Sequence, residues 1–274
     1  MANYGVIDLG SNSVRLVIFD VKDGISKKRP ITCKDFRSII NDKVMAGLSA
    51  YVDAGEFTPE GIARAVDVLS GHLKRARYFN CVRTDIFATA VLRNCTNSRE
   101  AISAIEKAIG APVNLLSARD EAHLSFTGAS CDRTIEKGTV VDLGGGSTEL
   151  TRVEGGCDFD DVSIGQGSLS SYAGYVEFVM PQASEVEAIE HAFLERVAET
   201  PVDLQKYRAE KLYGVGGSAR AAAKLYAQMT GEPCRPRTLT PAHFDALLNL
   251  LESNPSKFAH LAARAVPERI HTVG

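Results

Sequence analysis

One short pattern occurs twice in this chain. Residues 6–16 read VIDLGSNSVRL, and residues 140–150 read VVDLGGGSTEL. Each copy joins an apolar strand to an Asp, a turn of small residues and a second strand. Small residues let successive backbone N–H groups turn inward around an anion, and the Asp can hold a cation. The duplication therefore predicts two related lobes that face each other across a cleft, with phosphate as the ligand.

Length and composition agree with two lobes. The chain has 274 residues, 45% of them hydrophobic and 24% charged, which allows two lobes at 1–128 and 129–274. A net charge of -3 argues against a nucleic-acid-binding protein. No apolar run approaches the roughly 20 residues of a membrane span. We expect a soluble cytoplasmic protein with neither nucleic acid nor membrane as partner. Its six scattered cysteines, without a CxxC, are expected to be reduced.

Strands and helices alternate along the first lobe, which indicates an α/β fold. Thr58 and Pro59 predict a helix start, and apolar residues at helical spacing extend that helix to residue 77. The remaining expected elements are strands at 6–9, 14–21, 31–36 (an edge strand), 84–92 and 113–117, a loop at 93–97, a helix capped by Ser98 and stopped by Gly110, and a helix containing Glu121.

The second lobe is expected to begin near Lys137 and to repeat the opening. A third glycine turn, GVGGSAR (214–220), leads directly into a helix, whose free N–H groups suit an anion. The other expected elements are strands at 139–143, 147–153, 158–164 and 211–215, a helix from Ser184 and a final helix from Thr240–Pro241. Because no structural stop follows, the second lobe is expected to lack its last segment.

Five segments together resemble one protein family. They read IDLGSNSVRL, ATAVLRN, LLSARDEAHLSFTGA, VDLGGGSTEL and YGVGGSAR, between residues 7 and 220. The set resembles the actin-like superfamily and within it, most closely, the Ppx/GppA family of exopolyphosphatases and guanosine pentaphosphate phosphohydrolases. The resemblance implies two RNase H-like (actin-like) lobes, each a mixed sheet flanked by helices, with a cleft between them.

The resemblance also implies an activity. We expect Mg²⁺-dependent hydrolysis of the terminal phosphoanhydride of inorganic polyphosphate. Hydrolysis of guanosine pentaphosphate (pppGpp) is the close alternative, and a non-catalytic sensor of (p)ppGpp or polyphosphate and an actin-like ATPase or kinase are the alternatives from other classes. Assembly as a homodimer is left open.

Two carboxylates are the candidate catalytic residues. Glu121, in the RDEA segment, corresponds to the proposed catalytic base of the family, which would orient a water and accept its proton. The alternative is a solvated carboxylate that complements a helix dipole. Glu149, after the second glycine turn, is expected to orient water or metal, and its counterpart in the first copy is Arg15.

Other residues are assigned to metal and substrate. Asp142 and Asp8 end buried strands and are candidate Mg²⁺ ligands, with capping of the turn as the alternative. Arg93 is expected to bind phosphate bidentately unless it is an ordinary surface residue. The expected substrate-binding residues are Ser11, Asn12, Ser13, Arg93, Gly144, Gly145, Gly146, Ser147, Thr148, Gly216, Gly217 and Ser218.

The chain departs from the family pattern at three places. Ala118 stands where the family usually has Gly, and KVMAGL (43–48) stands for a segment resembling RLGEGL, which puts a phosphate contact there in question. The C-terminal helical domain of long members is expected to be absent. Basic clusters at 27–29, 74–77 and 235–237 are read as solvated faces rather than as a path for a polyanion.

Overall fold

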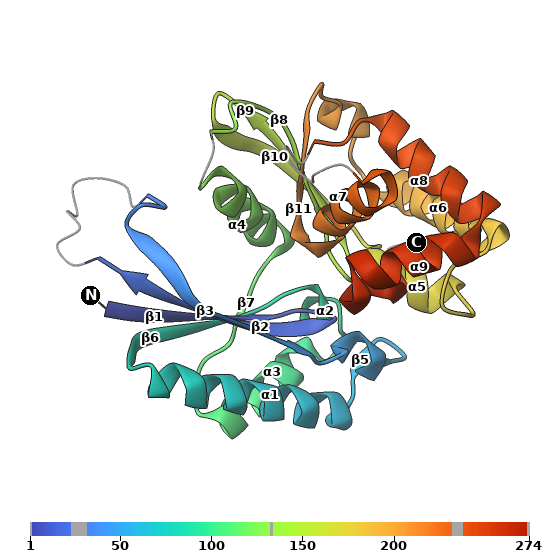
Figure 1. The fold of residues 1–274 in the computed structure, drawn as a ribbon. Coiled ribbons are helices and arrows are strands. Elements are labelled where there is room, and N and C mark those ends of the chain that lie inside the picture. Colours follow the sequence, from blue (N-terminus) through green and yellow to red (C-terminus); the bar gives the residue numbers. More distant parts are fainter. Residues whose placement is uncertain (1, 23–31, 132–133, 232–237, 273–274) are drawn as a thin grey trace. The chain divides into compact units, whose positions relative to one another are not determined.

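The computed structural model describes residues 2–22, 32–131, 134–231 and 238–272 (Figure 1). The chain divides into two compact units, Met1–Thr134 and Ile135–Gly274. The division falls a few residues after the position expected from the sequence, between 128 and 129. Each unit is an α/β structure built on one mixed sheet, which confirms the expected fold class.

The sheet of unit 1 has the strand order β3-β2-β1-β6-β7. The first three strands form an antiparallel meander, whereas β6 and β7 continue the sheet in parallel with β1. This is the mixed sheet expected of an RNase H-like lobe. The strands are β1 (Ala2–Leu9), β2 (Ser13–Val21), β3 (Phe36–Met45), β6 (Cys81–Ala88) and β7 (Asn114–Leu115), and β4 (Val52–Asp53) and β5 (Glu56–Phe57) form a separate hairpin.

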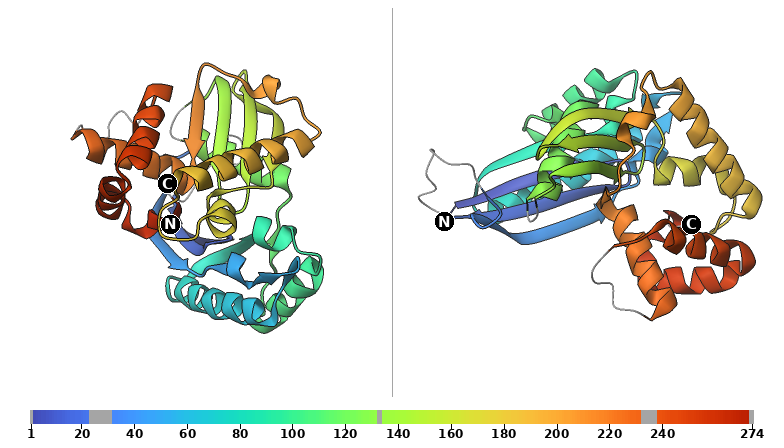
Figure 2. Two further views of the ribbon diagram at one scale, coloured as in Figure 1. Left: turned by 90° about the vertical axis from the view of Figure 1, so that its right-hand side faces the viewer. Right: turned by 90° about the horizontal axis from the view of Figure 1, so that it is seen from above.

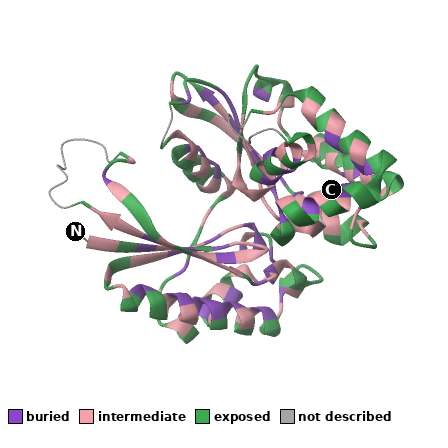
Figure 3. Ribbon diagram, viewed as in Figure 1, coloured by how far each residue is buried: buried purple, intermediate pink, exposed green. Residues whose placement is uncertain are grey.

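Helices α1 (Pro59–Tyr78) and α3 (Ser98–Ile109) cover one face of this sheet (Figures 1 and 2). The Thr58 side chain caps α1 by accepting a hydrogen bond from the Gly61 N–H at 3.2 Å, as the sequence predicts. Alternate residues of β1 and β2 point toward the helices and are buried, and buried and partly buried apolar residues of α1 pack against them (Figure 3). The short helix α2 (Ala90–Arg93) follows β6, and α4 (Ala118–Ser130) lies on the side of the sheet opposite α1 (Figure 1).

Unit 2 repeats this design with a four-stranded sheet of order β10-β9-β8-β11. Its strands are β8 (Lys137–Leu143), β9 (Thr148–Glu154), β10 (Cys157–Ile164) and β11 (Leu212–Val215), and β11 is parallel to β8. The helices are α5 (Ser168–Tyr175), α6 (Ala183–Glu199), α7 (Gly216–Thr230), α8 (Pro241–Ser253) and α9 (Pro255–Ala265). Apolar residues of α7, α8 and α9 form a second buried cluster that includes Leu225, Leu251 and Phe258.

Several expected boundaries are wrong. The edge strand begins at Phe36 rather than covering 31–36, because residues 32–35 form a turn; residue 31 lies outside the described residues. Residues 90–93 form α2, not the end of a strand. Asn97, rather than Ser98, occupies the N-cap of α3, and its side chain pairs with the backbone of Phe57.

The helix at Thr240–Pro241 is not the last element. Asn254 caps a further helix, α9, through its side chain, and η1 (Leu48–Tyr51), η2 (Leu204–Tyr207) and η3 (Pro267–Thr272) are 3₁₀ turns. Helix α5 has no counterpart in the expected element order. No helix within the described ranges is long and apolar enough to cross a membrane.

The expectation that every cysteine is reduced is also wrong. Cys33 and Cys131 form a disulfide across a sequence separation of 98 residues, with their Cα atoms 5.6 Å apart. So wide a separation gives no pairing signal in the sequence. Cys81, Cys95 and Cys157 are free thiols, and Cys234 lies outside the described residues, as do the basic clusters at 27–29 and 235–237.

Candidate functional site

The first glycine turn of unit 1 connects β1 to β2 and is supported from one side. The Ser11 carbonyl accepts a hydrogen bond from Ser49 N, and the Asn12 carbonyl accepts two, from Ala46 N and Gly47 N, at 2.9–3.0 Å. In a trans peptide the N–H points opposite to the C=O. The N–H groups of Asn12 and Ser13 therefore point away from the supporting segment, as an anion-binding turn requires.

Charged residues form a row beside this turn. Asp8 pairs with Arg15 across β1 and β2, and Arg15 pairs with Lys43 across β2 and β3. Directly opposed residues in antiparallel strands share a face, so one carboxylate and two cations line the face turned away from α1. Lys43 is the first residue of the KVMAGL segment, which stands for RLGEGL in the family pattern. A cation is therefore present at the position of the family's Arg.

Glu121 and Arg93 contact each other within unit 1. Arg93 Nη1 lies 2.6 Å from Glu121 Oε2 and also donates to the Leu116 carbonyl at 3.2 Å. Glu121 lies in the first turn of α4, which Ser117 caps, and Arg93 ends α2. Their side chains are only 21% and 17% exposed, so neither is an ordinary surface residue. The neighbouring Asp120 is exposed and pairs with Ser117 at 2.6 Å.

The second glycine turn is held by the N-terminus of α5. The Gly144 carbonyl accepts hydrogen bonds from Ser168 N and Oγ. The Gly145 carbonyl accepts hydrogen bonds from the N–H groups of Leu169 and Ser170. By the same peptide geometry, the N–H groups of Gly145 and Gly146 point away from α5. The two turns thus present their amides in the same way, although different elements support them.

Asp142 and Glu149 share one face of the second sheet. They are directly opposed across β8 and β9, and Glu149 is opposed to Ser163 on β10. Glu149 is 2% exposed, and its Oε1 accepts a hydrogen bond from Ser163 Oγ at 2.8 Å. A carboxylate buried to this extent requires compensating charge or hydrogen bonds. Sequence reasoning missed Ser163, whose role follows only from the strand register.

The third glycine turn lies beside Asp142. Gly216 has φ +84°, and a Cβ there would meet Asp142 Oδ1 at 2.9 Å, so both space and conformation favour glycine. Helix α7 begins here without a side-chain cap. Its first N–H groups form a positive helix end next to the carboxylate-bearing end of β8.

Arg269, on η3, packs directly on this turn. A Cβ on Gly217 would overlap the Arg269 guanidinium, which donates to Ser218 Oγ at 3.4 Å. A cation is electrostatically unfavourable at the positive end of a helix unless an anion lies nearby. The Asp142 carboxylate beside Gly216 is such an anion, and a phosphate group at this corner would be a second. No sequence motif marks Arg269, and only its contact with the turn identifies it.

The remaining predicted residues lie in or beside these turns. Thr148 begins β9, and its hydroxyl donates to the Gln166 carbonyl at 2.7 Å, so that it holds the segment before α5. Ser147 is buried, and its carbonyl closes the turn by accepting from Gly144 N at 3.0 Å. The residues predicted from the first half of the chain lie in unit 1, and the others lie in unit 2. Their assigned roles stay predictions.

The donor set suits a hard cation only in part. No cluster of three or more His, Cys, Asp or Glu side chains fit to hold a metal occurs in the part of the chain that is described. Asp142 and Glu149 nevertheless place two carboxylates on one face of a sheet, beside glycine turns. Mg²⁺ is usually bound by one or two carboxylates together with substrate phosphates, and these residues fit that mode.

Comparisons with known proteins agree on one family. The sequence profile of the Ppx/GppA phosphatase family matches residues 7–269. Among curated proteins, exopolyphosphatase 2 of Mycobacterium tuberculosis is 30% identical over 158 residues, which cover 55% of this chain and 48% of that protein. The match thus spans about half the length of this relative.

Solved structures share the fold. A crystal structure of an exopolyphosphatase from Cytophaga hutchinsonii superimposes with a TM-score of 0.81 at 21% identity, covering 99% of this chain and 86% of the other. A Ppx/GppA family member from Aquifex aeolicus gives 0.74 at 23% identity, covering 99% and 86%. At these identities the likeness establishes the fold.

Proposed function

The chain belongs to the Ppx/GppA phosphatase family, and from this premise we propose that it is an exopolyphosphatase, which hydrolyses the terminal phosphoanhydride of inorganic polyphosphate. The relative of 30% identity carries the name of this activity. The observation that carries the proposal is that backbone N–H groups in both glycine turns point away from the segments that support the turns. N–H groups presented in this way bind phosphate oxygens without any need for side-chain charge.

Cations supplement the amides in each unit. In unit 1, Arg15 and Lys43 stand beside the turn on the face that carries Asp8. In unit 2, Arg269 lies against the start of α7. Each phosphate unit of a polyphosphate carries negative charge, so binding of the polymer requires several cationic and amide contacts rather than one.

The proposed reaction is a direct attack by water. A water oxygen bonds to the terminal phosphorus, the bond from that phosphorus to the bridging oxygen breaks, and the shortened chain leaves with that oxygen. The Glu121 carboxylate takes the water's proton. Arg93 binds Oε2 of this carboxylate at 2.6 Å and so fixes the orientation of the group that accepts the water's proton. Arg93 is thus assigned to position Glu121 as well as to bind phosphate.

We further propose that Mg²⁺ assists this reaction. Asp142 and Glu149 would hold it in unit 2, with Asp8 as the candidate in unit 1. When bound, the ion neutralises phosphate charge, which lowers the repulsion that an attacking water encounters. Ser163 keeps the buried Glu149 carboxylate in place by its hydrogen bond.

The test is phosphate release from long-chain polyphosphate and from pppGpp, with and without Mg²⁺. Glu121→Gln is the catalytic variant, and Asp120→Asn, on the exposed neighbour, is the matched control. We expect Glu121→Gln to lower kcat by roughly 10²–10⁴-fold, the usual contribution of a general base, and Asp120→Asn to change it little. Faster turnover of pppGpp than of polyphosphate would replace the proposed substrate. No turnover of either by the wild type would refute the proposed hydrolysis.

A further inference from the structure

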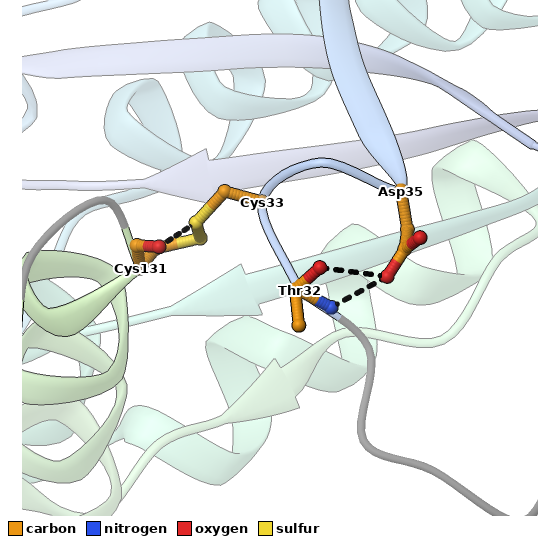
Figure 4. The surroundings of a disulfide bond; sticks show 4 residues. All are labelled: Thr32, Cys33, Asp35 and Cys131. Atoms are coloured by element: carbon orange, nitrogen blue, oxygen red, sulfur yellow. Dashed lines mark hydrogen bonds between the residues drawn. A yellow bond between two sulfur atoms is a disulfide. The ribbon is translucent and has the colours of Figure 1, made fainter.

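The disulfide in unit 1 joins two segments that the sheet alone does not connect. Cys33 precedes β3, and Cys131 directly follows α4, the helix that carries Glu121 (Figure 4). The sulfur of Cys33 also contacts the Cys131 carbonyl oxygen. The disulfide therefore connects the C-terminal end of the Glu121 helix to the β2–β3 connection.

The segment that carries Cys33 is fixed by its own hydrogen bonds. Asp35 is buried, and its carboxylate accepts hydrogen bonds from Thr32 N at 2.8 Å and from Thr32 Oγ1 at 2.9 Å (Figure 4). The Asp35 N–H closes the same turn by donating to the Thr32 carbonyl at 2.9 Å. Cys33 thus lies within a tight, hydrogen-bonded turn directly before β3. The disulfide therefore attaches α4 to a fixed segment of unit 1.

Helix α4 buries little of its own surface. Of its thirteen residues, only Ala122 and Phe126 are buried. The Ser117 cap and the Arg93–Glu121 ion pair hold its N-terminal end. Ten residues of helix, roughly 15 Å, separate Glu121 from Cys131. Because a helix is stiff over this length, a restraint at Cys131 limits the tilt of the whole element.

From these contacts we propose that the Cys33–Cys131 disulfide is a reversible redox latch that holds α4 and thereby sets the position of Glu121. The disulfide lies near the protein surface, since Cys131 is exposed and Cys33 is half-buried. Exposed disulfides are the ones that small thiols reduce readily. The effect on catalysis rests on the proposed function; the effect on α4 does not.

The redox step balances with a small dithiol as reductant. One thiolate of the dithiol attacks the sulfur of Cys131, the S–S bond breaks, and Cys33 leaves as a thiolate that takes up a proton. The second thiolate of the reductant then expels Cys131, and the reductant becomes a cyclic disulfide. A low-molecular-weight disulfide restores the latch by the reverse exchange and becomes two thiols.

The experiment compares oxidised protein with protein reduced by dithiothreitol. A non-reducing peptide map identifies the Cys33–Cys131 linkage, hydrogen exchange follows the amides of α4, and phosphate release from polyphosphate follows activity. We expect reduction to speed exchange over residues 122–130 and, since a misplacement near 1 Å can cost on the order of 10²-fold, to lower kcat by about 10-fold or more.

Variants separate the latch from general effects of the reductant. Cys131→Ser is expected to behave as the reduced protein and to ignore dithiothreitol, whereas Cys157→Ser, on an exposed free cysteine of unit 2, keeps the wild-type response. If Cys131→Ser does not fold, Cys33→Ser and the reduced wild type provide the same comparison.

Each outcome decides a different part of the proposal. Unlinked Cys33 and Cys131 in the oxidised protein, or identical exchange of α4 in both states, would overturn the latch. Altered exchange with unchanged hydrolysis would overturn its coupling to Glu121. If neither state hydrolyses polyphosphate while exchange still responds, the latch stands and the proposed function fails.

Discussion

Gly167 supports the second glycine turn, and replacing it with alanine tests how closely that turn is built. The backbone of Gly167 is extended, with φ -136°, so any residue can adopt its conformation. A Cβ there would nevertheless lie 2.7 Å from three backbone atoms of the turn, Gly144 O, Gly145 C and Ser147 N. The conflict is therefore one of space alone.

The size of the displacement follows from these distances. Ordinary contact begins at 3.4 Å, so the turn or Gly167 must move by the difference from 2.7 Å, about 0.7 Å. The atoms that the Cβ would meet belong to the backbone of the turn, and they cannot rotate away as the end of a flexible side chain would. Overpacking of this kind costs about 1–3 kcal/mol of stability. A shift near 1 Å at a reacting group can cost on the order of 100-fold in rate, so we expect kcat/KM to fall roughly 10–100-fold.

The assay is phosphate release from polyphosphate, paired with thermal unfolding by circular dichroism. Gly165→Ala is the matched control, because a Cβ at Gly165 meets nothing within 4 Å. We expect the control to retain activity within about twofold, since open space adds no strain. Equal activity of Gly167→Ala and Gly165→Ala would show that the position of the turn does not govern the reaction.

Three further changes test other parts of the structure. Ser163→Ala removes the 2.8 Å donor from the buried Glu149 carboxylate, so the free energy of unfolding should fall by about 1–3 kcal/mol in urea titrations, with recovery in Ser163→Thr; an unchanged midpoint would refute this role. Burial lowers the pKa of the fully buried His72 from its usual 6.5, in spite of the opposing effect of its hydrogen bond to the Val14 carbonyl. The folded state thus prefers the neutral imidazole, and the stability it contributes is complete above about pH 6.5 and is lost as pH falls below that value; His72→Gln should flatten this decline in thermal unfolding between pH 5 and 7, and a parallel decline would contradict the assignment. Cys131→Ser should lower the unfolding free energy of the oxidised protein by about 2–4 kcal/mol, because the disulfide closes a long loop in the unfolded chain, and equal stability would argue against the bond.

The repeated pattern predicted the sheets well because it is local. Each copy specifies a buried strand, a turn and a second strand, and the register Asp8–Arg15 in unit 1 is repeated as Asp142–Glu149 in unit 2. Helix α1 was predictable for the same reason, since Thr58 and the apolar spacing lie within the element itself. Local patterns carried the fold class and most of the candidate residues.

Contacts between distant segments were not predictable from such patterns. The Cys33–Cys131 disulfide and the placement of Arg269 on Gly217 each depend on how remote elements pack. The start of α3 shows the same limit on a small scale. Ser98 looks like a cap, but Asn97 takes that position without a capping hydrogen bond from its side chain, which pairs instead with the backbone of Phe57, forty residues earlier.

The central claim is that Glu121 activates water for attack on a terminal phosphoryl group. The most direct measurement follows the oxygen in phosphate released from polyphosphate in water labelled with a heavy oxygen isotope, analysed by mass spectrometry. The account predicts that each phosphate released by the wild type carries one labelled oxygen and that Glu121→Gln releases labelled phosphate at least roughly 100-fold more slowly. Release of unlabelled phosphate, or an undiminished rate in Glu121→Gln, would contradict it.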